Sequence, residues 1–195
     1  MQHTTLFEGV NLYMKAIDLD KDTAVVAAWT YQPELARQLS NDQPARPLTV
    51  SEVRKVFEKW FKEIEQANRS YFFAVCTKRD DRLIGFLRIS SVLWVHGAAT
   101  FALVIGDADD RAAFGSDALQ MGLCYAFDEL NLFRVTAVVE EHDEIARDLY
   151  NQAQFYLEVR QRQAVLHNGR FWDRLWFGML RPEWQIYQNA AGVAA

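Results

Sequence analysis

The sequence predicts an α/β fold in which a mixed, mostly antiparallel sheet is flanked by helices, and three observations carry that prediction. Strand-like runs between residues 71 and 105 are separated by short turns, a spacing typical of an antiparallel meander. A helical stretch between Ile105 and Phe133 implies a crossover, so the strands on either side are candidates for parallel neighbours. Two late strands joined at Asn168-Gly169 predict a hairpin.

The first third of the chain is predicted to hold one strand and three helical pieces. Residues 10–17 alternate between apolar and polar, which predicts a strand, and Asp20 can cap a helix that runs to about residue 29. A short helical piece follows at 33–39. The run 49–52 has the spacing of a capping box, in which two side chains each bind the other's backbone N–H. Behind that box, apolar side chains recur along one helical face: Val53, Val56, Phe57, Trp60, Phe61 and Ile64.

The centre of the chain carries the most informative pattern, a strand that runs into a loop and then a helix. The strand covers Phe101 to Ile105, the loop Gly106 to Ala113, and the helix Phe114 to Leu130. The first N–H groups of a helix have no helical partner, and the positive end of the dipole points at the loop. Such a junction binds anions readily. The sequence therefore predicts a ligand that carries phosphate.

The remaining elements follow from cap and turn residues. Gly122 allows the central helix to pack closely on a sheet, and Asn131 can end it in a left-handed conformation. Residues 133–140 are predicted as a strand, and 143–154 as a helix capped by Asp143. The meander strands are 71–77, 82–90 and 100–105, and the hairpin strands are 155–165 and 170–180.

Length and composition limit the classes of protein that remain. The 195 residues are expected to form one domain, with 50% hydrophobic and 24% charged residues and a formal net charge of −5. No basic stripe is present, which argues against nucleic acid, and no apolar run is long enough to span a bilayer. The N-terminus lacks the pattern of a secretion signal, and Cys76 and Cys124 lie in apolar segments, as expected of free thiols. We therefore expect a cytoplasmic protein with no membrane partner.

Four stretches of the chain share their order and spacing with a known family. They are RLIGFLRI (82–89), ALVIGDADDRAAFGSDAL (102–119), AFDELNLFRVTAVVEEHDEIARDLYNQAQF (126–155) and HNGRFWDRLWFGMLRPEW (167–184). Together they resemble the GNAT superfamily of acyl-CoA N-acyltransferases, and most of all the branch with the bacterial ribosomal-protein N-terminal acetyltransferases. The resemblance covers residues 9–184 of a single domain spanning 1–195. It implies a GNAT-like fold and an acetyl-CoA-dependent N-acetyltransferase.

The resemblance places acetyl-CoA at the central junction. It implies coenzyme contacts from Leu103, Val104, Ile105, Arg111, Ala113, Phe114, Gly115, Ser116 and Asp143. The loop departs from the family pattern, because it is one residue shorter and lacks a glycine. Asp143 stands where the family has asparagine, and an ionised carboxylate cannot donate a hydrogen bond. These departures favour an alternative, a catalytically degenerate member of the fold that binds CoA weakly or acts through protein contacts.

The implied reaction is direct attack of an amine on the thioester. A backbone N–H near Leu103 or Val104 could stabilise the oxyanion, and the Tyr150 phenol could protonate the departing thiolate. Glu140 is the candidate base. The residues expected to line the acceptor groove are Trp29, Tyr31 and Trp172.

The candidate base has a simpler alternative. Glu140, Glu141 and His142 can also form a solvated charge cluster before a helix, and a histidine beside acids is more often a surface residue. The histidines show no metal-ligand spacing, so no metal site is predicted. Candidate acceptors are a protein N-terminus or a small-molecule amine such as an amino sugar, a polyamine or an antibiotic. The protein is expected to be a monomer or a homodimer.

Overall fold

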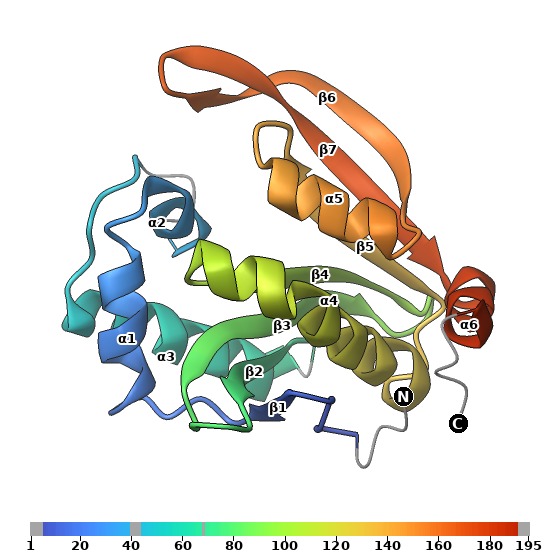
Figure 1. The fold of residues 1–195 in the computed structure, drawn as a ribbon, viewed down its shortest axis with the longest axis horizontal. Coiled ribbons are helices and arrows are strands. Elements are labelled where there is room, and N and C mark those ends of the chain that lie inside the picture. Colours follow the sequence, from blue (N-terminus) through green and yellow to red (C-terminus); the bar gives the residue numbers. More distant parts are fainter. Residues whose placement is uncertain (1–5, 40–43, 68, 191–195) are drawn as a thin grey trace.

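Seven strands form one sheet in the computed structural model, which describes residues 6–39, 44–67 and 69–190 (Figure 1). The strands are β1 (Leu12–Lys15), β2 (Tyr71–Thr77), β3 (Leu83–Leu93), β4 (Ala98–Ile105), β5 (Arg134–Glu140), β6 (Tyr156–His167) and β7 (Arg170–Leu180). Their order is β1-β2-β3-β4-β5-β7-β6. β4 and β5 are parallel, and the other neighbouring pairs of described strands are antiparallel. The predicted meander, crossover and mixed sheet are confirmed. The ends of the predicted domain lie outside the described residues.

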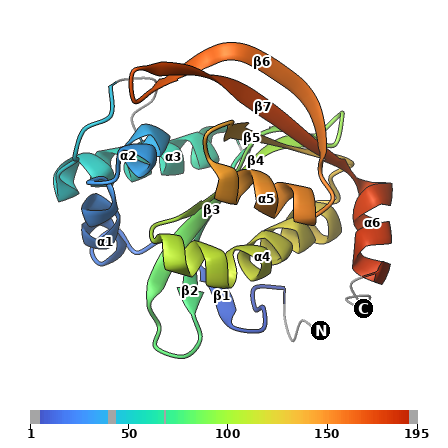
Figure 2. The same cartoon turned by 45° about the horizontal axis from the view of Figure 1, so that its top comes forward.

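Helices cover both faces of the sheet. They are α1 (Asp22–Trp29), α2 (Pro33–Leu39), α3 (Val50–Ala67), α4 (Ala108–Cys124), a π-helix η1 (Tyr125–Glu129), α5 (Glu144–Gln152) and α6 (Arg181–Ala190). Figures 1 and 2 show α4 and α5 on one face and α3 on the other. Neighbouring residues of β3 divide the core accordingly, because Leu87 packs on the α4 side and Phe86 on the α3 side. None of the helices in the described ranges is long and apolar enough to cross a membrane.

A side-chain cap marks the start of α3 but not that of α1. Thr49 and Glu52 form the predicted capping box before α3: Thr49 N–H donates to Glu52 Oε2 at 2.9 Å, and Glu52 N–H donates to Thr49 Oγ1 at 3.3 Å. The prediction that Asp20 caps α1 is wrong. Lys21 precedes α1 and provides no side-chain cap, whereas Asp18 Oδ1 accepts from the N–H groups of Asp20 and Lys21 at 2.9 and 3.3 Å in the turn before the helix.

The central helix α4 begins at Ala108, so the prediction of a loop over 106–113 is wrong. Asp107 provides the physical reason. Its Oδ1 accepts from the N–H groups of Asp109 and Asp110 at 2.9 and 3.3 Å, which caps the helix early. Ala112 and Ala113 lie in the segment where the family pattern has glycine, and alanine favours a helix over a loop.

Two predicted turns are confirmed by their backbone angles. Asn131, beyond the end of η1, has a left-handed φ of 52°. Asn168 and Gly169, between β6 and β7, have φ values of 50° and 72°, as a type I′ hairpin turn requires. The resulting hairpin extends past α5 toward the end of the molecule that holds α2 (Figures 1 and 2).

Helix α6 has no counterpart among the predicted elements. It anchors the C-terminal end through Trp184, which is 0% exposed and stacks on Phe127 with ring centroids 5.9 Å apart. Pro182 in its first turn is the sequence signal that could have revealed it.

Candidate functional site

The parallel strands β4 and β5 diverge after Phe101 and Ala137, the last residues that pair. A pocket opens where they part. Its wall includes Leu103, Val104, Ile105, Arg111, Glu140, Asp143 and Tyr150, all named from the sequence. The divergence of the two strands thus brings residues of β4, α4, β5 and α5 to one place.

The register of β4 determines which of its backbone groups face this pocket. Gly106 N–H donates to Ile84 O of β3 at 2.9 Å. Because hydrogen-bonded pairs alternate along antiparallel strands, Val104 also directs its N–H at β3, whereas Leu103 directs its N–H toward β5. Pairing with β5 has ended at this level. Leu103 is therefore the residue whose N–H can meet an oxyanion, a choice that the sequence left open.

Tyr150 of α5 borders the same pocket and is 5% exposed. Its ring packs against Phe155 and Phe177, with centroids 5.1 and 6.0 Å away. Burial raises the pKa of Tyr150 well above its usual range, and a hydrogen bond with the Leu103 backbone lowers that pKa in part. Only a donor stabilises a phenolate, so this bond comes from Leu103 N–H. Tyr150 is therefore protonated at neutral pH beside the N–H that faces the pocket.

Arg111 and Asp143 join the start of α4 to the start of α5. Arg111 Nη1 lies 3.2 Å from Asp143 Oδ2, and Arg111 Nη2 donates to Ile105 O at 3.4 Å. Asp143 also caps α5, as predicted, by accepting from Ala146 N–H at 3.0 Å. The carboxylate that replaces the family's asparagine thus has partners inside the protein.

The N-terminus of α4 differs from the expected anion site. Asp107, Asp109 and Asp110 surround it, and the Asp107 carboxylate occupies N–H groups that an anion would use. Four residues expected to contact the coenzyme lie inside α4, beyond its first turn: Ala113, Phe114, Gly115 and Ser116. At such positions each N–H is bound by the carbonyl four residues earlier. None of these four described residues lines the pocket.

Substitution of Asp107 tests whether the acidic residues at the N-terminus of α4 weaken the binding of the diphosphate. Asp107→Asn keeps a capping side chain but removes a negative charge beside the helix N-terminus, so acetyl-CoA should bind about two- to fivefold more tightly. Asp107→Ala should gain more affinity but destabilise the protein by about 1 kcal/mol, because the cap is lost. Calorimetry with acetyl-CoA measures both. Acetyl-pantetheine, which lacks the diphosphate, is the control and should bind all three proteins equally. Equal acetyl-CoA affinity in all three would contradict the argument.

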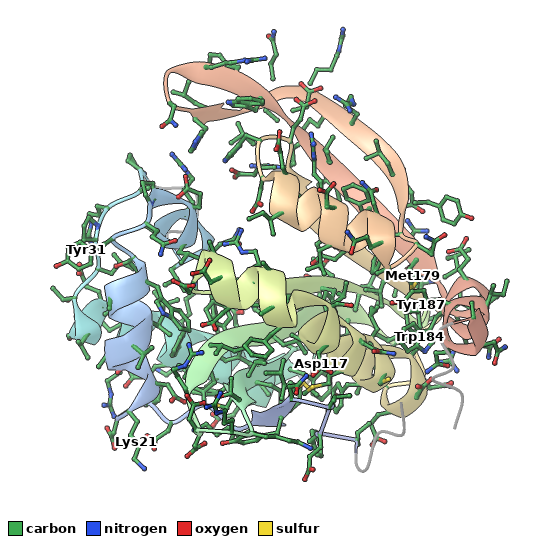
Figure 3. All side chains as sticks on the ribbon, viewed as in Figure 1. Lys21, Tyr31, Asp117, Met179, Trp184 and Tyr187 are labelled. Carbon is green, nitrogen blue, oxygen red and sulfur yellow. The ribbon has the colours of Figure 1, made fainter. Side chains whose placement is uncertain are left out.

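The aromatic residues predicted for the acceptor groove lie outside the pocket wall. Trp29 packs over Gly106 so closely that a side chain at that glycine would overlap its ring. Tyr31 is 76% exposed and lies at the margin of the molecule (Figure 3). Trp172 of β7 approaches the site through His142, with ring centroids 5.7 Å apart. The structure therefore keeps Trp29 and Tyr31 away from the pocket and leaves Trp172 behind a pocket residue.

A cluster that the sequence did not predict lies beside the pocket. Glu34 of α2, His142 after β5 and His167 at the end of β6 bring potential ligand atoms within 4.8 Å of one another. Because these three residues are far apart in the sequence, no local spacing pattern predicts the cluster. The His142 side chain is 9% exposed, so its interpretation as a surface residue is wrong. The two imidazole rings are stacked, with centroids 3.9 Å apart and planes at 12°, so their in-plane lone pairs run parallel and do not converge on one ion.

Comparison with known proteins gives a consistent result. Residues 11–155 match the sequence model of the family described as acetyltransferase (GNAT) domain. The Probable N-acetyltransferase YjcK of Bacillus subtilis is 25% identical over 182 residues, which cover 91% of this chain and 98% of the relative. The spermidine N(1)-acetyltransferase of Vibrio cholerae is 26% identical over 91 residues, 47% of this chain and 53% of the relative.

A solved structure extends the comparison to the fold. The spermidine N-acetyltransferase of Vibrio cholerae, in complex with CoA and spermine, superposes with a TM-score of 0.73 over 90% of this chain and 98% of that chain. The sequence identity in this comparison is 19%, so the likeness is one of fold.

Proposed function

The chain belongs to the acetyltransferase (GNAT) family, and we propose that it transfers an acetyl group from acetyl-CoA to a cationic primary amine. Family membership makes it an N-acyltransferase; the proposal concerns its site and its acceptor. One observation carries the proposal: Leu103, Tyr150 and Glu140 all line the pocket that opens where β4 and β5 part, and Tyr150 contacts the Leu103 backbone. An oxyanion donor, an acid and a proton acceptor are what transfer from a thioester to an amine requires.

The residues of the pocket suit one end of acetyl-CoA better than the other. Leu103, Ala146 and Leu149 offer an apolar wall for the acetyl and pantetheine groups. The acidic first turn of α4 is a poor partner for the diphosphate. We therefore expect binding mainly through the pantetheine arm, with a weak contribution from the diphosphate.

The roles of the individual residues follow from their surroundings. As negative charge develops on the oxygen of the thioester carbonyl, that oxygen replaces the Tyr150 hydroxyl as the acceptor of the Leu103 N–H. Tyr150, which burial keeps protonated, gives its proton to the departing sulfur. Glu140, whose side chain is 25% exposed, lies between the pocket and solvent and is placed to carry a proton outward.

The acceptor is proposed to be a polyamine-like cation. Glu34 and Glu140 place two carboxylates in the pocket wall, which favours an amine carrying further positive charge. The similarity to spermidine acetyltransferases agrees with this choice. A protein N-terminus, as in the ribosomal-protein branch that the sequence resembles, is the second candidate. We place the reaction in a reducing cytoplasm, in line with the free thiols Cys76 and Cys124.

An acceptor panel tests the proposal. CoA release is measured with spermidine, spermine, an amino sugar and a peptide with a free N-terminus, and the polyamines should give the highest kcat/KM. Glu34→Gln should raise the KM for spermine about two- to fivefold, the size expected for one partly exposed ion pair. Glu65→Gln, on the exposed face of α3, is the matched control. Acetyl-CoA binding without CoA release for any acceptor would instead favour the degenerate alternative.

A further inference from the structure

His142 lines the pocket but has no partner for its ring nitrogens. Both Nδ1 and Nε2 are buried and make no hydrogen bond within the described structure. An unsatisfied buried polar group is unfavourable by about 1–3 kcal/mol, so such groups are rare unless a ligand or a reaction uses them. Glu140 Oε2 lies 3.4 Å from Nε2, near enough for an ion pair once the ring is charged. The ring is thus set between the pocket and a carboxylate that reaches solvent.

We propose that His142 is the catalytic base, taking the proton that the attacking amine loses and passing it through Glu140 to solvent. This inference rests on the proposed function. As the bond between nitrogen and carbonyl carbon forms and the bond between carbon and sulfur breaks, one proton moves from nitrogen to His142. One proton moves from Tyr150 to sulfur. Both residues regain their resting forms by proton exchange with solvent, so the net reaction converts amine and thioester into amide and thiol.

The second histidine keeps the base neutral. Arg37 Nη1 lies 3.0 Å from His167 Nδ1. A guanidinium only donates, so Nδ1 accepts and the proton of His167 sits on Nε2, which lies 3.7 Å from Glu34. These contacts fix the orientation of the His167 ring, which lies in contact with His142. Two stacked imidazoles cannot both become charged without strong repulsion.

The groups around His142 determine the pH range in which it can accept a proton. Burial and His167 lower the pKa of His142 below its ordinary 6.5, whereas Glu140, Asp143 and Glu34 act in the opposite direction. The ring of Trp172, which packs against His142, carries no charge. The Arg170 guanidinium lies over that indole ring, with Cζ 4.2 Å from the ring centroid. Below its pKa, His142 is protonated and cannot accept a proton. Loss of the base should therefore lower the rate as the pH drops through a value under 6.5.

The first test compares His142→Gln with His96→Gln, a matched control in the exposed turn between β3 and β4. With the best acceptor of the panel, His142→Gln should lower kcat about 10²-fold, remove the acidic limb of the pH profile and leave acetyl-CoA affinity unchanged. His96→Gln should change none of these. An unaltered kcat and acidic limb in His142→Gln would overturn the inference, whereas an inactive wild type would instead overturn the proposed function.

A second variant separates chemistry from structure. His167→Gln removes the ring that disfavours charge on His142, so the acidic limb should move to higher pH; a merely structural role would leave the limb in place. NMR titration of the His142 Cε1 proton in the wild type gives the same information if a variant does not fold. Adding the amine should shift the His142 titration and not that of His96, and an unshifted His142 contradicts the role. Activity lost to a chelator and restored by Zn²⁺ would also overturn it, by making the cluster a metal centre.

Discussion

Replacing Tyr150 with phenylalanine should lower kcat by about 10²-fold or more, because general acid catalysis of this kind contributes 10²–10⁴-fold. The phenol is the acid in contact with the Leu103 backbone, and burial holds its pKa high enough to keep it protonated. Phenylalanine keeps the ring packed between Phe155 and Phe177, so stability should change little. Steady-state CoA release measures the turnover.

Binding measurements decide what such a loss means. Acetyl-CoA affinity of Tyr150→Phe should stay close to that of the wild type, because the hydroxyl acts on the leaving sulfur rather than on the bound coenzyme. Tyr187→Phe is a matched control, since Tyr187 stacks on Trp184 at α6, away from the pocket (Figure 3). Undiminished turnover in Tyr150→Phe would remove the tyrosine from the mechanism.

Replacing Gly122 with valine should destabilise the protein by about 2–3 kcal/mol, the range for overpacking a well-filled core. A Cβ atom there would meet the Phe101 ring at 2.8 Å and would overlap Leu87. Both neighbours are fully buried, at 1% and 0% exposure, so neither can move aside freely. In thermal unfolding the midpoint should fall by roughly 5–10 °C.

Gly115 provides the matched control in the same helix. A Cβ there meets the Leu149 side chain at an ordinary 3.5 Å and Arg111 Cγ at 4.0 Å, so Gly115→Ala should stabilise the helix by up to about 1 kcal/mol. Acetyl-CoA affinity should not change, since this glycine lies inside α4 and outside the pocket wall. If Gly115→Ala also destabilised the protein, the difference in packing around Gly122 and Gly115 would not explain the effect of Gly122→Val.

Features that depend on contacts between residues close in the sequence were predictable from the sequence. The capping box of Thr49 and Glu52, the cap at Asp143 and the turn at Asn168-Gly169 each depend on contacts a few residues away. The parallel pair β4 and β5 also followed, because a helix between two strands leaves few other arrangements. The residues of the pocket wall at the diverging strands were instead named through the family resemblance.

Residues whose role depends on distant partners were not predictable. His142 and His167 meet only because β7 lies beside β5 and carries β6 with it. The loop expected over residues 106–113 is helical for a different reason: the cap at Asp107 and the helix preference of Ala112 and Ala113 start α4 earlier. The Asp117 carboxylate likewise has a distant partner, because it accepts from the N–H of Asn11 at 3.0 Å and so anchors the entry to β1.

The hairpin of β6 and β7 has a consequence for how acceptor preference can diversify. Its far end delivers His167 to α2, and the two-residue turn fixes which side of the ribbon that histidine occupies. Because side chains alternate along a strand, adding or deleting a single residue at the tip would rotate His167 to the opposite side and withdraw it from Arg37. Exchanging hairpin tips between relatives, with the sheet left intact, is therefore a compact route to enzymes with altered amine selectivity.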